Sequence, residues 1–297
     1  MNTIKGILPS ANFHLWKSCN MNCTYCFARY DDLPSGAKPS RQNQILTIKA
    51  LAKAGVEKLT FVGGEPTLCP WLQDLIMYGK KLGMVTMLVT NGALLDAVML
   101  RDLRSVLDWV CLSIDSLSPA TNALIGRQVK GRAPMEEGDY RRILSYASDM
   151  DYRIKVNTVV STYNRNEDFR AFIEDVCPDR WKIFKALPIQ GQNYITLEQW
   201  NVSDNDFQSF VRMHKSTKGV SVISEDNDAM TGSYMMIDPL CRLFDNVDGR
   251  QSYTRPINAV GLHEALREVR IDTAGFISRG GLYDWSARQK EEVACPA

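Results

Sequence analysis

The 297-residue sequence contains no long hydrophobic run, and no segment approaches the roughly 18 apolar residues that a membrane-spanning helix needs. The first ten residues also lack the apolar stretch of a signal peptide. The net charge is only +1, so no overall field attracts nucleic acid or anionic lipid. We therefore expect a cytoplasmic, monomeric protein that binds neither nucleic acid nor membranes.

The sequence also lacks internal repeats, low-complexity tracts and Gly/Ser linkers. Instead, apolar β-rich runs alternate with helical patterns, which favours βαβ units and a parallel sheet. The expected strands are Asn12–Trp16, Leu59–Val62, Val85–Thr90, Trp109–Ile114, Arg153–Val160 and Trp181–Leu187. The expected helices are Gln42–Ala54, Leu72–Leu82, Leu95–Ser105, Met135–Met150, Asp168–Val176 and Asp204–Lys215.

Six such units predict an α/β fold in the form of a partial (β/α)6 barrel, resembling an incomplete TIM barrel. We expect residues 1–190 to form the barrel core. Residues 191–297 should form a C-terminal extension that packs on the core, completes the site and belongs to the same structural domain. Barrel chemistry lies at the C-terminal ends of strands. The unusual motifs follow predicted strands, which places them at one shared site.

Three cysteines, Cys19, Cys23 and Cys26, lie within eight residues after the first predicted strand. Cysteine thiolates are the usual ligands of iron–sulfur clusters, and three of them would leave one iron open to a small molecule. The alternatives are a zinc site or three unrelated thiols, but structural zinc takes four ligands and no second cysteine pair is present. The other five cysteines are scattered and are expected in the core or at the surface. In a reducing compartment we expect none of the eight in a disulfide.

With Tyr25 before the last cysteine, the motif resembles the CxxxCx-aromatic-C signature of the radical S-adenosylmethionine (SAM) superfamily. The resemblance implies a [4Fe–4S] cluster whose open iron binds SAM, and a barrel of the radical SAM type. Gly63, Gly64 and Glu65 resemble the superfamily's GGE motif, in which the backbone and the glutamate contact the SAM ammonium. The resemblance further assigns Asn91 to the SAM site, and Ser113 and Arg127 to the methionine carboxylate, which suits the planar fork of an arginine.

Beyond these motifs, the chain from Asn12 to Ser286 resembles the viperin family of antiviral radical SAM enzymes and its prokaryotic relatives. The matching stretches are Asn122–Arg127, Lys155–Asn157, Arg180–Phe184, Gly191–Asn193, Ser233–Tyr234 and Arg279–Gly281. The resemblance implies dehydration of a ribonucleoside triphosphate, CTP, UTP or GTP, to its 3′-deoxy-3′,4′-didehydro form. An adenosyl radical removes the ribose 4′ hydrogen, the 3′-hydroxyl leaves as water, and the product terminates RNA chains. A flavodoxin or ferredoxin would supply electrons.

A triphosphate needs several converging cations, and the expected ones are Lys155, Arg180, Lys182 and Arg279. Lys155 alternates with apolar neighbours on its strand, so its side chain should face the barrel interior. The backbone amides that follow Arg279, beginning with Gly280, could form a phosphate-binding nest.

The resemblance assigns Asn12 to the nucleoside. Asn157, two residues after Lys155, shares its strand face and should help to orient the ribose or the phosphates. His14 is expected to be either a satisfied core group or a group that supports the site from behind. Tyr234 is the candidate proton donor or relay, and Lys155 is a second catalytic candidate.

Two departures from the animal enzymes concern the chain ends. Only about ten residues precede the first predicted strand, so the membrane-binding N-terminal helix of vertebrate viperins is not expected, and Arg288–Ala297 does not match the animal tail. Two alternatives stay open, namely a radical SAM enzyme with another substrate, or a non-enzymatic iron–sulfur protein. The first alternative usually carries extra cysteines or a terminal Gly-Gly, and neither is present. An electron carrier would not need Glu65 and Arg127.

Overall fold

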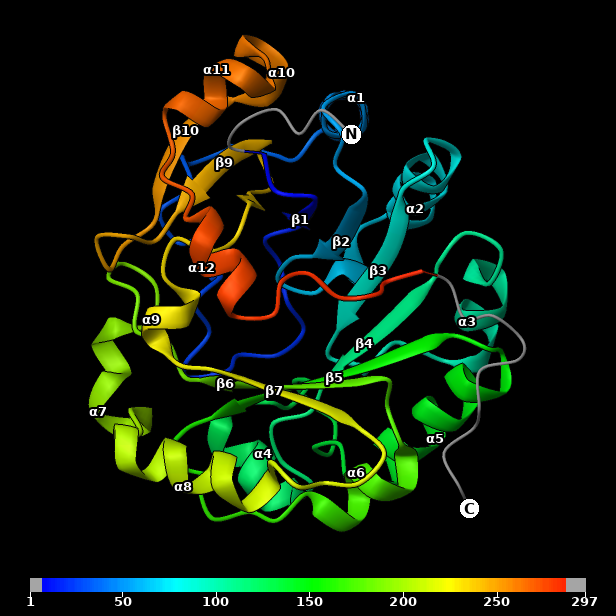
Figure 1. The fold of residues 1–297 in the computed structure, drawn as a ribbon, viewed down its shortest axis with the longest axis vertical. Helices are drawn as coiled ribbons and strands as arrows, with labels where there is room; N and C mark the ends of the chain where they lie inside the picture. Colours follow the sequence, from blue (N-terminus) through cyan, green and yellow to red (C-terminus); the bar gives the residue numbers. More distant parts are fainter. Residues whose placement is uncertain (1–6, 287–297) are drawn as a thin grey trace.

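A computed structural model describes residues 7–286, and a single sheet of ten strands forms its centre (Figure 1). Residues 1–6 and 287–297, which include Cys295, lie outside the described part. The strands run in the order β10-β9-β8-β1-β2-β3-β4-β5-β6-β7 across the sheet. Their bounds are β1 Ser10–His14, β2 Lys58–Val62, β3 Val85–Thr90, β4 Trp109–Ser113, β5 Arg153–Val160, β6 Arg180–Lys185, β7 Ser221–Glu225, β8 Met236–Ile237, β9 Arg242–Asp245 and β10 Ser252–Pro256.

Strands β1 to β7 pair in parallel with their neighbours, β8 is parallel to β1, and β9 and β10 are antiparallel. All six predicted strands are present with ends within two residues of expectation. Two further strands extend the parallel part of the sheet beyond these six, β8 beside β1 and β7 beside β6. In β7, Ser221 and Ser224 are exposed and Val222 and Ile223 are only half-buried. This edge strand therefore lacks the continuous apolar run of a central parallel strand.

The sheet is open, with β7 and β10 at its two edges. It curves around a central space, and most of the helices cover its outer face, as in a partial barrel (Figure 1). The bounds are α1 Arg41–Lys53, α2 Leu72–Lys81, α3 Ala97–Leu103, α4 Pro119–Ile125, α5 Glu137–Asp149, α6 Arg170–Val176, α7 Leu197–Trp200, α8 Asp204–His214, α9 Asn227–Met230, α10 Ile257–Val260, α11 Leu262–Arg267 and α12 Thr273–Ser278, with 3-10 turns at Pro66–Leu68 and Tyr194–Thr196. No helix within residues 7–286 combines the length and apolarity needed to cross a bilayer.

The core lies between the outer face of the sheet and the helices. In β2, Leu59 and Phe61 are fully buried on that side, whereas Lys58 and Thr60 line the central cavity. Helix α1 begins where the Ser40 hydroxyl accepts a hydrogen bond from the Asn43 amide, which satisfies one free donor at the helix start. Two-residue alternation in the strands therefore separates an apolar outer layer from a polar interior.

The segment after residue 190 completes the sheet at both edges, since it supplies β7 on one side and β8 to β10 on the other. After α12 the chain crosses the N-terminal ends of the parallel strands (Figure 1, red). There Lys58 donates a hydrogen bond to Tyr283 at 2.6 Å, and the Trp109 indole donates one to the Trp285 carbonyl at 2.9 Å. This segment therefore closes the base of the barrel. The division at residue 190 stays a prediction, and one sheet includes strands from both parts.

Candidate active site

One cavity of about 320 Å³ opens at the centre of the barrel. Every residue that the sequence assigned to cluster, SAM or substrate borders it, although these residues come from opposite ends of the chain. They are Asn12, Cys19, Cys23, Cys26, Gly63, Gly64, Glu65, Asn91, Ser113, Arg127, Lys155, Asn157, Arg180, Lys182, Tyr234, Arg279 and Gly280. A second hollow of about 520 Å³, between residues 55–57, 82–85 and 282–286, contains none of them.

The loop after β1 carries the three cysteines, which are free thiols. It is held against the end of α4, where the Asn22 and Thr24 amides donate to the Gly126 and Ile125 carbonyls at 3.0 and 2.8 Å. Gly126 has a φ of 84°, and a Cβ there would overlap the Asn22 carbonyl. The left-handed conformation and the close approach both require glycine.

N–H groups point at all three sulfurs. The Met21 amide lies 3.4 Å from Cys19 Sγ, Arg127 Nη1 lies 3.9 Å from Cys23 Sγ, and the Ala28 backbone donates to Cys26. Burial raises the pKa of Cys23 to about 12 and also raises that of Cys26, so the bare thiols keep their protons. Donors aimed at sulfur favour thiolates, the form that ligates a cluster, so these residues fit a three-cysteine [4Fe–4S] site. Within residues 7–286, no three His, Cys, Asp or Glu side chains converge to hold a single metal ion.

Of the other described cysteines, Cys69, Cys111 and Cys241 are buried free thiols. Cys177, at the end of α6, is disulfide-bonded, so the expectation of eight reduced cysteines is wrong at this position.

The turn after β2 brings backbone close to the cysteine loop. A Cβ at Gly63 would lie 2.8 Å from the Trp16 carbonyl oxygen, and one at Gly64 would overlap the Lys17 carbonyl. The buried Glu65 carboxylate accepts hydrogen bonds from Thr67 and Thr90 on Oε1 and from the Asn91 amide at 2.9 Å on Oε2. Protein donors therefore occupy most of its capacity, and Oε2 keeps the free acceptor position.

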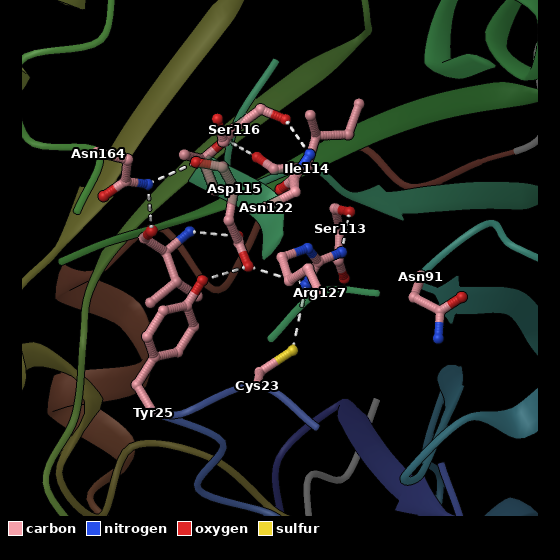
Figure 2. Close-up of polar contacts among 12 residues, drawn as sticks. Cys23, Tyr25, Asn91, Ser113, Ile114, Asp115, Ser116, Asn122, Arg127 and Asn164 are labelled. Carbon is pink, nitrogen blue, oxygen red and sulfur yellow. Dashed lines mark hydrogen bonds and ion pairs between the residues drawn. The ribbon is translucent and has the colours of Figure 1, made fainter. Parts of the chain in front are cut away.

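Asp115 lies at the centre of a buried network at the C-terminal end of β4 (Figure 2). Its Oδ2 accepts hydrogen bonds from the Tyr25 hydroxyl at 2.7 Å and from Arg127 Nη1 at 2.8 Å, while Oδ1 accepts from the Val159 amide. Arg127 Nη2 donates to the Ser113 carbonyl at 2.5 Å. Asp115 was assigned no role from the sequence, although it lies only two residues after Ser113, which ends β4.

The arrangement at Arg127 leaves a donor for a ligand. Its side chain is 6% exposed, and its Nε has no hydrogen-bond partner within the described residues. Burial alone would lower the pKa of this guanidinium, but Asp115 raises it well above the usual value, so the group stays charged. Asn91 lies apart from this network (Figure 2) and donates from Nδ2 to Asn20 Oδ1 at 2.7 Å.

The opposite end of the cavity, towards the base of the barrel, gathers five cations. All five are largely buried, with exposures of 4 to 8% for the four that are most enclosed. They are Lys58, Lys155, Arg180, Lys182 and Arg279. Lys58 was not among the cations expected from the sequence. It starts an apolar strand and alternates with buried neighbours as Lys155 does, so the same signal could have identified it.

Burial, together with repulsion from the other cations, lowers the pKa of Lys58 and Lys182 well below the usual range. Burial also lowers the pKa of Lys155 and Arg180. Concentrated positive charge of this kind is unfavourable without an anion, so the site suits a polyanionic ligand.

Between the two ends, unpartnered polar atoms face the cavity. Asn157 Oδ1 and His14 Nδ1 are buried without a hydrogen-bond partner within the described residues. Burial lowers the pKa of His14 to about 3, so the ring is neutral. Of the two expectations for His14, a satisfied core group does not hold for Nδ1, while a group that supports the site from behind stays a prediction. Asn12, two residues before His14, borders the same space, which leaves room for a ligand that forms hydrogen bonds.

Comparison with known proteins places this cavity in a family. A family model described as "Radical SAM superfamily" matches residues 14–176. The "S-adenosylmethionine-dependent nucleotide dehydratase" of Flammeovirga pacifica is 41% identical over 94% of this chain and 97% of its own length. A protein of the same name from Lacinutrix mariniflava is 39% identical over 96% of this chain. This chain spans 60% of that relative's length.

The similarity extends to animals and to solved structures. The Danio rerio "S-adenosylmethionine-dependent nucleotide dehydratase RSAD2" is 31% identical over 93% of this chain and 78% of its own length. Streptococcus suis SuiB, solved bound to S-adenosylmethionine, shares the fold with a TM-score of 0.67 at 15% identity, over 93% of this chain and 68% of SuiB. The chain therefore belongs to the radical SAM superfamily and, within it, to the S-adenosylmethionine-dependent nucleotide dehydratases, as the resemblance to viperin predicted.

Proposed function

We propose that this chain dehydrates a ribonucleoside triphosphate, CTP, UTP or GTP, to its 3′-deoxy-3′,4′-didehydro analogue, with SAM and a [4Fe–4S] cluster as cofactors. The observation that carries the proposal is the two-ended cavity, which has three cysteines at one end and five largely buried cations at the other. The printed names of the relatives support the same reaction class.

Cys19, Cys23 and Cys26 would hold the cluster. The backbone at Gly63 and Gly64, the Glu65 carboxylate and Asn91 would hold the methionine amino group of SAM, and Ser113 and Arg127 its carboxylate. When bound, cluster and SAM supply a 5′-deoxyadenosyl radical that removes the 4′ hydrogen of the ribose. The buried cavity keeps water from the reacting carbon.

Lys58, Lys155, Arg180, Lys182 and Arg279 would bind the triphosphate, with the Gly280 backbone beside them. Arginine forks and lysine ammonium groups are the usual partners of phosphate oxygens. Asn157 Oδ1, which has no hydrogen-bond partner within the described residues, would accept a hydrogen bond from a ribose hydroxyl. Asn12 would contact the nucleoside. This arrangement directs the phosphates to the barrel base and the sugar towards the cysteines.

Loss of the 4′ hydrogen and then of the 3′-hydroxyl as water requires one further electron and one proton at the sugar. Tyr234 is our candidate for the proton relay. Burial raises the pKa of Tyr234 well above its usual value, so the phenol keeps its proton, and Lys182 donates to the Tyr234 hydroxyl at 2.9 Å. Lys155 is a second candidate from the same wall. A flavodoxin or ferredoxin would deliver the electrons, and the product, lacking a 3′-hydroxyl, would terminate viral RNA chains.

Anaerobic reconstitution tests the proposal. The cluster is assembled and reduced, SAM is added, and CTP, UTP, GTP and ATP are supplied separately. We expect one or more triphosphates to accelerate 5′-deoxyadenosine formation, and mass spectrometry to detect a product lighter than its substrate by one water. The proposal fails if no triphosphate stimulates SAM cleavage in a protein that has the cluster.

A further inference from the structure

Glu225 is a fully buried carboxylate at the end of β7, and nothing in the reaction so far uses it. It does not border the cavity itself, but it contacts three side chains that do. Its Oε1 forms ion pairs with Lys182 and with Arg279 Nη1, the latter at 3.1 Å, and its Oε2 accepts the Tyr234 hydroxyl hydrogen. One carboxylate therefore lies directly behind the cavity wall that carries the proposed phosphate contacts.

These three partners come from separate parts of the fold. Lys182 belongs to β6, Tyr234 precedes β8, and Arg279 follows α12. Strand β7 is an edge of the sheet and does not pair with β8, so backbone hydrogen bonds do not join the two. The side chain of Glu225 thus connects the edge strand β7 to β6 and to the segments beside β8 and α12.

The contacts also restrain the cations. Arg279 donates from Nε and Nη2 to the Ser233 carbonyl at 3.2 and 2.9 Å, and its guanidinium carbon lies 3.5 Å from the centre of the Tyr234 ring. Lys182 donates to the Tyr234 hydroxyl. Every polar partner of Glu225 is therefore also tied to a second group, and the four side chains form one closed network.

The pKa shifts of these side chains also indicate that Glu225 restrains the cations. Burial alone would raise the pKa of Glu225, but Lys182 and Arg279 hold it below the usual value, so the group stays ionised. Burial lowers the pKa of Lys182, and Glu225 is the first group that opposes this shift. Without the carboxylate, Lys182 and Arg279 would repel each other and the remaining cations, and Lys182 would lose its proton more readily.

We infer that Glu225 is a positioning residue that fixes Lys182, Arg279 and Tyr234 in the arrangement that receives the triphosphate. The inference rests on the proposed function and adds to it a residue outside the cavity. It predicts a distinctive direction for the change in triphosphate affinity when the carboxylate is neutralised. A carboxylate near phosphates repels them, so removing its charge would tighten binding if charge alone mattered. A positioning role requires the opposite result.

The test uses Glu225→Gln in the reconstituted full chain, with calorimetric titration of the triphosphate that gives the strongest response and of its unphosphorylated nucleoside. Glutamine keeps the size but loses the charge that holds Lys182 and Arg279. We expect the triphosphate Kd to rise about tenfold, with the nucleoside Kd unchanged. KM should rise more than kcat falls. Glu225→Asp keeps the charge on a shorter side chain and should restore part of the triphosphate affinity. If the glutamine variant does not fold, the aspartate variant is compared with the wild type in its place.

Asp248→Asn is the matched control, because Asp248 is a half-exposed carboxylate of the same extension, paired with Arg270. It should behave as the wild type.

A pH series adds a readout that a merely structural role would not change. Glu225 faces Lys182, Arg279 and Tyr234 directly, with Lys155 and Arg180 within electrostatic range. The variant's affinity should fall more steeply than the wild type's as the pH rises above neutrality.

The outcomes of these titrations distinguish the positioning role of Glu225 from the proposed function. Equal or tighter triphosphate binding by Glu225→Gln overturns the positioning role, as does a lower kcat with an unchanged Kd. If the wild-type protein itself binds no triphosphate, the proposed function fails and the inference with it. Weaker triphosphate binding restricted to the Glu225 variants supports both.

Discussion

The Asp115 carboxylate lies 2.8 Å from Arg127 Nη1, and both side chains are at most 6% exposed. The same carboxylate oxygen accepts the hydroxyl hydrogen of Tyr25, which lies within the cysteine loop. Arg127 in turn points Nη1 at Cys23 Sγ (Figure 2). One buried ion pair therefore joins the cysteine loop to the end of β4, and it sets the direction of the arginine that we assign to SAM.

Replacing Asp115 by Asn should destabilise the protein by about 3 kcal/mol, because it leaves the buried Arg127 charge without its partner. Tyr25→Phe is the comparison, since it removes one hydrogen bond to the same oxygen and should cost only about 1 kcal/mol. Urea unfolding of both variants measures the difference. Equal costs for the two would mean that the ion pair adds nothing beyond a hydrogen bond.

Gly64→Ala should displace the cysteine loop, because the added Cβ would overlap the Lys17 and Ser18 carbonyls. We expect a lower melting temperature and a lower iron and sulfide content after reconstitution. Gly138→Ala is the matched control. This exposed glycine in α5 has no atom closer than 3.9 Å to an added Cβ, so alanine should stabilise the helix by about 0.5–1 kcal/mol. Full cluster loading of Gly64→Ala would contradict the steric argument.

The sequence predicted the cysteine end of the cavity well, because its signals are local. Cys19–Cys26 and the Gly63–Glu65 turn follow strands and Ser113 ends one, and parallel strands bring such residues to one edge. The cationic end depends on how the last hundred residues fold back. Nothing local to Lys58 indicates that Tyr283 will lie 2.6 Å away.

Glu225 shows most clearly what could not be predicted from the sequence. Its strand is short and half-exposed, so no strand pattern could be recognised there. Its three partners lie 9, 43 and 54 positions away along the chain. Glu65 illustrates a subtler limit, because its motif predicted a ligand contact while its protein donors could be identified only from the fold.

Cys23→Ala should abolish the cluster, because only two of its three cysteine ligands would remain. The expected result is a colourless protein after loading with iron and sulfide, together with the loss of SAM cleavage. Cys69→Ala provides the control. Cys69 is a buried free thiol that does not border the cavity, so its variant should load normally. A normally loaded and active Cys23→Ala protein would contradict the ligand assignment.

Lys58→Met should weaken triphosphate binding, because it removes one of five cations while keeping most of the side-chain volume. The loss of a charge-assisted contact is expected to raise the Kd about tenfold or more. Lys49→Met, at an exposed position of α1, is the control for a general change in charge. SAM cleavage without substrate should be equal in both variants and the wild type. An unchanged Kd would remove Lys58 from the site.

Triphosphate binding should also weaken as the pH rises above neutrality. Burial lowers the pKa of Lys58, Lys155 and Lys182, so these groups begin to lose their protons at a lower pH than ordinary lysines. A bound polyanion favours the charged form and raises those pKa values again. The complex must therefore hold more protons than the free protein, and by linkage its affinity falls as protons become scarce.

Calorimetry in two buffers of different ionisation enthalpy measures this proton uptake directly, since the apparent binding enthalpy then depends on the buffer. Lys58→Met and Lys182→Met should each reduce the uptake, because each removes a group that titrates, whereas Lys49→Met should leave it unchanged. Absence of proton uptake on binding, or an affinity that does not weaken with rising pH, would show that the buried lysines are already fully charged in the free protein. The positive end of the cavity would then be held in its charged form by Glu225 and the surrounding dipoles alone, before any phosphate arrives.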